Sequence, residues 1–409
     1  MSPFLQLTLA LAVMIFLAKA GGYISYRLGQ PAVLGELLMG ILLGPSLINF
    51  LHLPVFTDTH LESVVTELAE LGVMLLMFLA GLELHVSELV KSSKVAAFTG
   101  TLGVIFPLLF GFGMGSFFSL GTTSSIFLGL TLAATSVSIS AQTLMELNRL
   151  RTKVGIGLLG AAVFDDILVV LGLSAFTALM LPQSSDGLSV ILLIMGRMLL
   201  YLLLAVLIGY FLLPVLTHKV YQLEISQGLI AFVFVTLLLY SWLADVVGNM
   251  AAITGAFLAG LWFGRTSLRD RILNGFSIIA YGIFVPIFFI DVGLRADIRI
   301  ILGEDIWFFV VMVVIAILGK LMGCGLGGLL SGFSPRESLQ LGAGMMSRGE
   351  VGLIVATVGM DQGLIQSGTF SAVVGVVILT TLVTPPFLRY LFHQPTEAKS
   401  SKIPESEDG

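Results

Sequence analysis

Two adjacent aspartates, Asp165 and Asp166, lie inside the apolar run 154-VGIGLLGAAVFDDILVVLGLSAFTALM-180. An ionised aspartate at the centre of a bilayer costs about 2.5–3.5 kcal/mol on insertion scales. Neighbouring carboxylates also repel each other, so at least one keeps its proton near neutral pH unless a cation compensates. A purely structural role would need only one polar group, and a neutral one would suffice. The pair therefore predicts a site that binds a proton or a metal cation, with Asp166 and Asp165 as the ligands.

Lys320 lies within a second apolar run, 312-MVVIAILGKLMGCGLGGLL-330, and is a natural counter-ion for one of the two aspartates. A lysine in a low-dielectric environment is destabilised in its charged form unless it is paired. The alternative is that its ammonium group reaches the membrane surface. Lys320 lies more than a helical turn from either end of its run, which favours the paired role. Such a lysine could release its proton when a cation takes its carboxylate partner.

Other ionisable residues lie in apolar segments. Arg348 and Glu350 are two residues apart and point to different faces of a regular helix, so each is expected to have its own partner. A structural ion-pair role and a direct transport role both remain open for them. Asp291 is expected to pair with Arg295, one turn further on, rather than to face an aqueous funnel. Glu36 lies near a helix end and is interpreted as an interfacial residue.

The composition is that of a polytopic membrane protein, because 57% of the 409 residues are apolar and only 11% are charged. These values exclude a soluble small-molecule enzyme, and we expect neither enzymatic activity nor a cofactor. The net charge of −5 indicates no nucleic-acid partner. Cys324 is the single cysteine, so the chain has no intramolecular disulfide. The N-terminal segment lacks a basic region and a cleavage site, and is interpreted as the first membrane span.

Apolar stretches bounded by polar, glycine or proline residues predict an all-α protein with thirteen transmembrane helices. The predicted spans are 4–20, 31–51, 65–83, 94–117, 124–146, 153–180, 189–215, 226–244, 249–264, 275–294, 306–332, 338–360 and 368–392.

Lysine and arginine residues fix the expected orientation, because they accumulate in cytoplasmic loops. With the N-terminus outside, the outer loops hold only Arg295 and Arg299. The inner loops and C-terminal tail hold Arg27, Lys91, Lys94, Arg149, Arg151, Lys153, Lys219, Arg265, Arg269, Arg271, Arg336, Arg389, Lys399 and Lys402. We therefore expect a multi-pass protein of the cell inner (plasma) membrane, with its N-terminus outside and its C-terminus in the cytoplasm.

Two predicted helices share a glycine pattern that indicates an internal repeat. The segments 32-AVLGELLMGILLG-44 and 252-AITGAFLAGLWFG-264 both fit A-x-x-G-x4-G-x3-G. A six-helix block followed by one linker helix places the second block upside-down, as in many secondary transporters. The alternative is that the glycines only allow close helix packing. The predicted transmembrane region, 1–392, then comprises repeat one (about 4–180), a linker helix (189–215) and repeat two (about 226–392), before a short cytoplasmic tail (393–409).

The fifth and twelfth predicted spans, 124–146 and 338–360, correspond in such a repeat. Both of these spans, here called helices 5 and 12, contain residues that suit a broken helix. Helix 5 contains Thr135, Ser136, Ser138 and Ser140 in 133-AATSVSISAQ-142, and helix 12 contains 342-GAGMMSRGEVGLI-354. Hydroxyl groups and glycines in mid-span are best tolerated where freed backbone groups line a cavity. Broken helices also direct half-helix dipoles and free carbonyl groups at an ion site. Serine and threonine bonded within intact helices are the alternative.

Several stretches, in this order, resemble the monovalent cation:proton antiporter superfamily, specifically the NapA/GerN-like sodium/proton antiporters and the transmembrane domain of their Kef-like potassium relatives. The matching stretches are 31-PAVLGELLMGILLGPSL-47, 78-FLAGLEL-84, 135-TSVSIS-140, 160-GAAVFDDILVVL-171, 286-PIFFIDVGL-294 and 347-SRGEVGLI-354. The resemblance implies a thirteen-helix fold with a dimerisation domain, and hence a homodimer. It also implies a core domain that contains the broken, crossing helices 5 and 12 and moves like an elevator.

The resemblance also implies roles for single residues. Asp166 matches the aspartate that binds the cation and the proton, and Thr135, with Ser136 beside it, matches the break in helix 5. Asp165 matches a position that is Asp in members described as electrogenic, Asn in electroneutral ones and Gln in Kef-like ones. Lys320 matches the lysine that pairs with this first aspartate. The charged pair of helix 12 is matched by Arg348 and Glu350. Asp291 departs from the family, which often has a small or hydroxyl residue there.

The resulting hypothesis is exchange of Na+, or alternatively Li+ or K+, for protons that compete for Asp166 and Asp165. Potassium/proton antiport and a Kef-like gated potassium efflux system are the main alternatives. Kef-like proteins continue into a regulatory nucleotide-binding domain that we expect to be missing here, so regulation by that route would need a separate subunit. A carrier for organic anions would need arginines rather than paired aspartates at the midplane.

Overall fold

The structure is a computed structural model that describes residues 1–45, 47–84, 87, 91–180, 187–223, 225–295, 306–349, 352, 355–356, 359–360 and 363–392. Within these ranges every regular element is a helix, as the composition predicted. In chain order they are α1 (Pro3–Arg27), α2 (Ala32–Leu43), η1 (Phe50–His52), α3 (Leu61–Glu83), α5 (Ser93–Phe117), α6 (Thr122–Ala133), α7 (Val137–Glu146), α8 (Lys153–Met180), α9 (Gly187–Leu207), η2 (Ile208–Leu212), α10 (Leu213–Gln222), α11 (Gly228–Val246), α12 (Ala252–Phe263), α13 (Arg269–Ile279), η3 (Ala280–Phe284), α14 (Val285–Leu294), α16 (Ile306–Leu330), α17 (Pro335–Gly344) and α19 (Ser367–Phe392).

These helices confirm a multi-pass membrane protein. Among the described residues, ten helical segments are long and apolar enough to cross a bilayer, and α2 and α12 are shorter apolar helices. Together they account for every predicted span except that over 338–360. That span begins as α17, whose helix ends at Gly344. Three spans contain more than one helix: α6 with α7, α9 with η2 and α10, and α13 with η3 and α14.

Some helix boundaries differ from the prediction for local chemical reasons. The second span was predicted to continue to residue 51, but α2 ends at Leu43, directly before Gly44 and Pro45. Proline cannot continue a helix and restrains the residue before it. The first span was predicted to end at residue 20, but α1 continues to Arg27. Gly29, with φ of +72°, then supplies the left-handed conformation that ends the segment.

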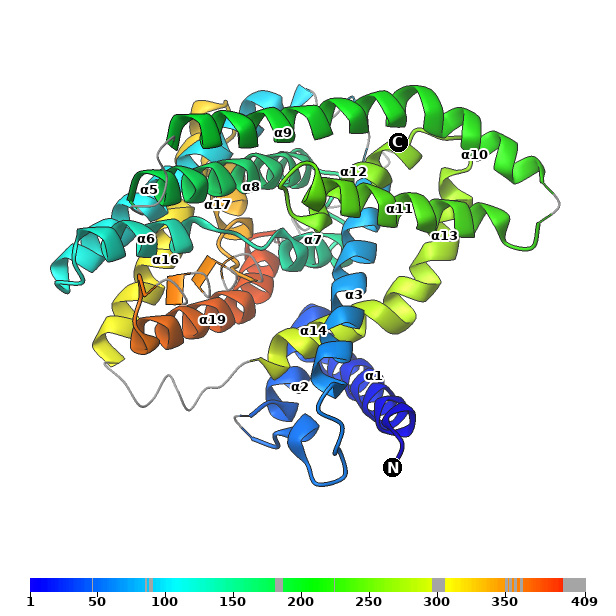
Figure 1. Cartoon of the computed structure of the whole chain (residues 1–409), viewed down its shortest axis with the longest axis horizontal. Coiled ribbons are helices and arrows are strands. Elements are labelled where there is room, and N and C mark those ends of the chain that lie inside the picture. The colour runs from blue at the N-terminus through cyan, green and yellow to red at the C-terminus, as the bar shows by residue number, and fades with distance from the viewer. Residues whose placement is uncertain are drawn as a thin grey trace, which may run out of the picture.

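The helices pack in two groups, which lie on the right and left of Figure 1. The first helix group contains α1, α2, α3, α11, α12, α13 and α14, with close pairs such as α3 with α12 and α2 with α14. The second helix group contains α5, α6, α7, α8, α16, α17 and α19, and α5 packs against α16, α6 and α8. α7 also contacts α2 and α3, so it joins the two groups.

The predicted glycine repeat is visible as a repeated set of contacts. A Cβ at Gly40 of α2 would lie 2.5 Å from the Ile290 carbonyl oxygen of α14, and one at Gly260 of α12 would lie 2.0 Å from the Phe78 carbonyl oxygen of α3. Only glycine permits these approaches. α2 and α12 thus make equivalent contacts with α14 and α3, as the two halves of a repeat should. The alternative of close packing also holds, because the repeated glycines are the packing points.

Candidate functional site

The two aspartates lie in the middle of α8 and point in different directions. Successive helical residues are rotated by about 100° about the axis. Asp165 is fully buried, with 0% of its surface exposed, whereas Asp166 is partly exposed. Asp165 faces Lys320 on α16, and the Asp166 Oδ2 atom accepts a hydrogen bond from the Thr254 hydroxyl on α12 at 3.1 Å. The neighbouring carboxylates therefore contact different helix groups.

The predicted pairing of Lys320 with one aspartate is present, and its partner is Asp165. The Lys320 Nζ and Asp165 Oδ1 atoms are 2.6 Å apart, and both residues are 0% exposed. The second carboxylate oxygen, Oδ2, is also buried and has no hydrogen-bond partner within the described part of the chain. Removing one partner of such a buried pair strongly destabilises the folded protein, because the other charge is then left buried and unpaired. The two residues are thus coupled through one short contact.

Glycines on α5 and α16 allow this contact to form. α5 packs between α8 and α16, and a Cβ at Gly103 would lie 2.5 Å from the Cys324 Sγ atom and 3.8 Å from the Asp165 Oδ1 atom. A Cβ at Gly323 of α16 would lie 2.3 Å from a carbonyl oxygen of α5. Since these helices approach almost backbone to backbone, the Lys320 side chain can reach across to Asp165.

The break that the sequence predicted in the fifth span, 124–146, is confirmed. α6 ends at Ala133 and α7 begins at Val137, and Ser136 between them has an extended backbone. The Ser136 N–H donates to the Ser347 carbonyl oxygen at 3.0 Å, and the Ser347 hydroxyl donates to the Ser136 carbonyl oxygen at 2.5 Å. Ser140 donates to the Gly344 carbonyl oxygen at the end of α17. The non-helical segment between α6 and α7 therefore meets the non-helical segment after α17, and the two satisfy each other's backbone groups.

Arg348 holds this crossing together through backbone carbonyl groups. Its guanidinium donates to the carbonyl oxygens of Ala134, at 2.7 Å, and Ala316, at 3.0 Å, while only 1% of the residue is exposed. Ala134 lies in the break between α6 and α7, and Ala316 lies on α16, one turn before Lys320. The structure thus gives Arg348 the separate partners that the spacing predicted. Glu350, its predicted companion, lies outside the described residues.

Thr135 and Ser136 were predicted to bind the ion, and both are buried in the break between α6 and α7. The Thr135 hydroxyl makes only a long contact of 3.5 Å with the Ala133 carbonyl oxygen. Ser138, in the first turn of α7, has a buried hydroxyl without a hydrogen-bond partner among the described residues. Two hydroxyl groups near the break are therefore weakly engaged by the protein. Hydroxyl oxygens in this condition can bind a hard cation or water.

Asp291 is paired as expected, and Glu36 is buried and paired as well. Arg295 Nε donates to the Asp291 carboxylate at 2.9 Å, and the Thr66 hydroxyl donates to it at 3.3 Å. Glu36, by contrast, was interpreted as interfacial but is only 7% exposed and pairs with Lys19 at 3.3 Å. Glu36 lies on the face of α2 that packs against α1, whereas Leu38 and Leu42 of the same helix are exposed. Position along a helix does not tell which of its faces is buried.

Two functional candidates were missed in the sequence, Thr254 and Glu146. The Glu146 carboxylate, at the end of α7, accepts hydrogen bonds from the backbone N–H groups of Ala32, at 2.6 Å, and Val33, at 3.2 Å. It thus caps the N-terminus of α2, where Pro31 provides no side-chain cap. That uncapped start was a signal in the sequence, but a partner more than a hundred residues away could not be identified from it.

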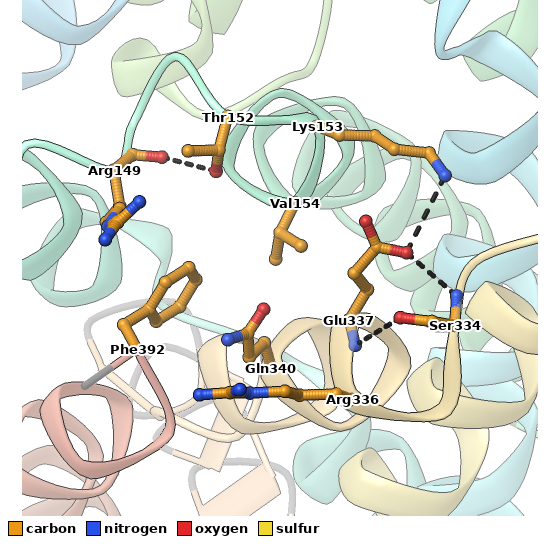
Figure 2. Close-up of a pocket in the computed structure, with 9 residues that line it drawn as sticks. All are labelled: Arg149, Thr152, Lys153, Val154, Ser334, Arg336, Glu337, Gln340 and Phe392. Carbon is orange, nitrogen blue, oxygen red and sulfur yellow. Dashed lines mark hydrogen bonds and ion pairs between the residues drawn. The ribbon is translucent and has the colours of Figure 1, made fainter. Parts of the chain in front are cut away.

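A cavity of about 390 Å³ lies at the starts of α8 and α17 and the end of α19 (Figure 2). Lys153 and Glu337 form an ion pair at 3.7 Å on one side of it, and Arg149, Arg336 and Gln340 are among the other lining residues. The Glu337 carboxylate also caps α17 by accepting from the Ser334 N–H at 2.8 Å. None of its lining residues is one of the predicted ion-binding residues, so the cavity is distinct from the site around the aspartates.

A family model described as "Sodium/hydrogen exchanger, transmembrane" matches residues 12–393 of the chain. Among curated relatives, the Na(+)/H(+)-K(+) antiporter GerN of Bacillus cereus is 37% identical over 393 residues, which cover 96% of this chain and 98% of that protein. The Na(+)/H(+) antiporter of Enterococcus hirae is 38% identical over 380 residues, which cover 93% of this chain and 96% of that protein.

A solved structure also resembles this fold. It is the sodium proton antiporter MjNhaP1 from Methanocaldococcus jannaschii, which matches with a TM-score of 0.70 and 20% sequence identity. The alignment covers 95% of this chain and 96% of that chain. At this identity the likeness establishes the fold alone.

Proposed function

The chain belongs to the sodium/hydrogen exchanger family of membrane transporters, and we propose that it exchanges Na+ for protons across the membrane in which it lies. One observation carries this proposal: a buried Lys320–Asp165 pair sits directly beside Asp166 on α8. Two relatives that are named as antiporters of Na(+) and H(+) match this chain over nearly their whole length, which supports the proposal.

Asp166 is proposed to hold either a proton or the cation. It is partly exposed, whereas its neighbour Asp165 is buried and already neutralised by Lys320. Thr135, Ser136 and water would complete the oxygen shell that a hard cation needs. Because a carboxylate cannot hold both occupants at once, cation and proton compete for it. An empty and negatively charged site is too unstable to cross the apolar interior, and this enforces exchange.

Asp165 and Lys320 are proposed to hold a second proton. When a cation binds at the aspartates, the Lys320–Asp165 contact would break and Lys320 would release its proton. Two protons would then move against one monovalent cation, which makes the exchange electrogenic. The Asp165 Oδ2 atom, which has no hydrogen-bond partner in the described part of the chain, supports this step, because it lies beside the oxygen that Lys320 occupies.

Alternating access is proposed to be a movement of the second helix group against the first. Few helices of one group contact helices of the other. By contrast, α8, α16 and the break between α6 and α7 all lie within the second group. On this proposal, repeats of about 4–180 and 226–392 flank the linker helix at 189–215. The protein would be a homodimer of the cell inner membrane, with its N-terminus outside and its C-terminus in the cytoplasm.

Everted membrane vesicles that contain the protein provide the test. Addition of Na+ is expected to dissipate an imposed proton gradient, as reported by a pH-sensitive dye. Asp166→Asn should reduce this response to the background level, since an amide cannot exchange a proton for a cation. Asp270→Asn is the matched control, because Asp270 is a surface residue with 86% of its side chain exposed. Unchanged exchange in Asp166→Asn would contradict the assignment of the site.

Asp165→Asn tests the second proton separately. If Asp165 and Lys320 hold it, exchange by this variant should no longer respond to an imposed membrane potential, although Na+ still binds. The measurement is the initial rate of exchange in proteoliposomes with and without a potassium diffusion potential. A potential-dependent rate equal to that of the wild type would contradict electrogenic exchange through this pair.

Potassium transport is the second candidate, and the name of the Bacillus cereus relative, the Na(+)/H(+)-K(+) antiporter GerN, favours it. A potassium/proton antiporter would give the same dye response with K+ as with Na+. A Kef-like gated potassium efflux system would instead conduct K+ without moving protons. Comparing Na+, K+ and Li+ in the same vesicles separates the three.

A further inference from the structure

Thr254, a residue of the first helix group, donates a hydrogen bond to Asp166 of the second group. Its hydroxyl donates to the Asp166 Oδ2 atom at 3.1 Å, and Thr254 is only 3% exposed. Threonine hydroxyls inside helices usually donate to the carbonyl four residues earlier. Thr131, Thr143 and Thr236 all do so. Thr254 lies in the first turn of α12 and gives its hydrogen bond to another helix instead.

This hydrogen bond joins helices that otherwise make little contact. α8 packs mainly against α5, α9, α6, α7 and α17, whereas α12 packs mainly against α3, α11, η2 and α10. The position equivalent to Thr254 in the glycine repeat of α2 is Leu34, an apolar residue. Only the second copy of the repeat therefore has a hydroxyl at this position, and there it meets a carboxylate.

We propose that Thr254 is a positioning and cation-binding residue that acts in only one end state of the exchange cycle. In the absence of a cation, its hydroxyl holds the Asp166 carboxylate by donating to Oδ2. When Na+ binds, the hydroxyl rotates so that an oxygen lone pair faces the ion and adds one ligand to its shell. This inference rests on the proposed function, because it assigns a further ligand to the same site.

A dependence on the membrane face follows from the arrangement of the helices. Asp166 belongs to the second helix group and Thr254 to the first, so movement of one group against the other separates them. The extra ligand is then present on one face of the membrane and lost on the other. Cation affinity is therefore higher on the face to which the present state opens.

The test compares Thr254→Val, which removes only the hydroxyl, with Thr254→Ser, which keeps it. Thr236→Val is the matched control, because Thr236 is a similarly buried threonine of the first helix group that bonds to its own helix. The apparent KM for Na+ is measured in everted and in right-side-out vesicles. Loss of a hydrogen bond to a charged group predicts a rise of about tenfold in KM for Thr254→Val on one face only.

Three results support the proposal together: a one-sided rise in KM for Thr254→Val, wild-type values for Thr254→Ser, and wild-type values for Thr236→Val. Equal values of KM for Thr254→Val and wild type on both faces overturn it, as does an equal rise on both faces. If Thr254→Val does not reach the membrane, Thr254→Ala decides by the same criteria. The proposed function is judged separately, since it fails only if the wild type shows no cation-dependent proton movement.

Discussion

At the scale of residues, the decisive feature is the division of labour between two adjacent carboxylates. Asp165 is buried against Lys320, while Asp166 is partly exposed and contacts Thr254. A buried ion pair contributes little net stability compared with well-packed apolar residues, so its presence points to function. The geometry places one buried charge pair beside one partly exposed carboxylate. That is the arrangement expected if Asp166 exchanges ions while Asp165 follows its state.

The stability of the pair can be measured with single and double substitutions. Lys320→Met leaves the Asp165 charge buried and unpaired, so it should lower the free energy of unfolding by about 3–5 kcal/mol. The double variant Lys320→Met/Asp165→Asn removes both charges and should recover most of that loss. The measurement is thermal unfolding of the purified protein in detergent. A double variant no more stable than Lys320→Met would show that the two side chains are not energetically coupled.

At the scale of elements, glycine positions decide how closely the helices around the site approach. Gly103 of α5 lies against Cys324 of α16, next to the charge pair. α17 begins with a capping box in which Ser334 and Glu337 bind each other's backbone N–H groups. The first feature sets the distance between the helices that carry the charge pair. The second fixes the start of the helix that leads into the crossing.

The close approach of α5 and α16 predicts a compensating pair of substitutions. Gly103→Ala places a methyl group 2.5 Å from the Cys324 Sγ atom, so the helices must separate and exchange should fall severalfold. Cys324→Ala alone removes the sulfur and should have little effect on exchange. The double variant Gly103→Ala/Cys324→Ala should exchange at nearly the wild-type rate, because the removed atom makes room for the new one. Failure of this rescue would contradict the packing described.

The capping box predicts a pH-dependent contribution to stability outside the membrane spans. The hydrogen bond from the Ser334 N–H lowers the pKa of Glu337 from its ordinary value of 4.5. A lowered pKa in the folded state means that the stabilisation is present above pH 4.5 and is lost as the pH falls through the folded-state pKa. Glu337→Gln should therefore lower Tm near neutral pH but not in acid. Ser334→Ala should lower Tm at both, since its hydroxyl does not titrate.

At the scale of the whole molecule, the two helix groups meet where α7 packs against α2 and α3 and α19 packs against α2, and a few polar contacts add to this junction. Glu146 of α7 caps α2, and Asp166 of α8 accepts from Thr254 of α12. Inside each group, by contrast, helices pack through glycines at near-backbone distance. Sparse contacts between groups and dense contacts within them are what a movement of rigid bodies requires. The structure is therefore suited to the proposed mechanism, which cross-linking can test.

A thiol cross-link between the groups should stop exchange, whereas one inside a group should not. In a Cys324→Ala background, Ala32→Cys/Glu146→Cys joins α2 of the first group to α7 of the second. Lys153→Cys/Glu337→Cys is the control, because it joins α8 to α17 within the second group, across the ion pair drawn in Figure 2. A short bifunctional thiol reagent should abolish exchange in the first variant only, as measured in vesicles. Undiminished exchange in the cross-linked first variant would contradict movement between the groups.

The sequence alone determined the features that depend on local composition and spacing. Long apolar runs predicted the membrane spans, matching glycine intervals predicted the repeat, and hydroxyl residues at 135–140 predicted the break in helix 5. Asp165, Asp166 and Lys320 stood out because charges are rare in such runs. These inferences succeed because a bilayer imposes the same demand on every segment that crosses it.

The tertiary structure alone decided which residues meet. It placed Glu146 on the start of α2, gave Asp166 a hydrogen bond from Thr254, and gave Arg348 the carbonyl groups of Ala134 and Ala316 as partners. It also showed that Glu36 is buried, although its position near a helix end had suggested the interface. Each of these facts depends on the rotation and spacing of helices that are distant in the chain. Those quantities are set by packing between surfaces, and no local pattern in the sequence records them.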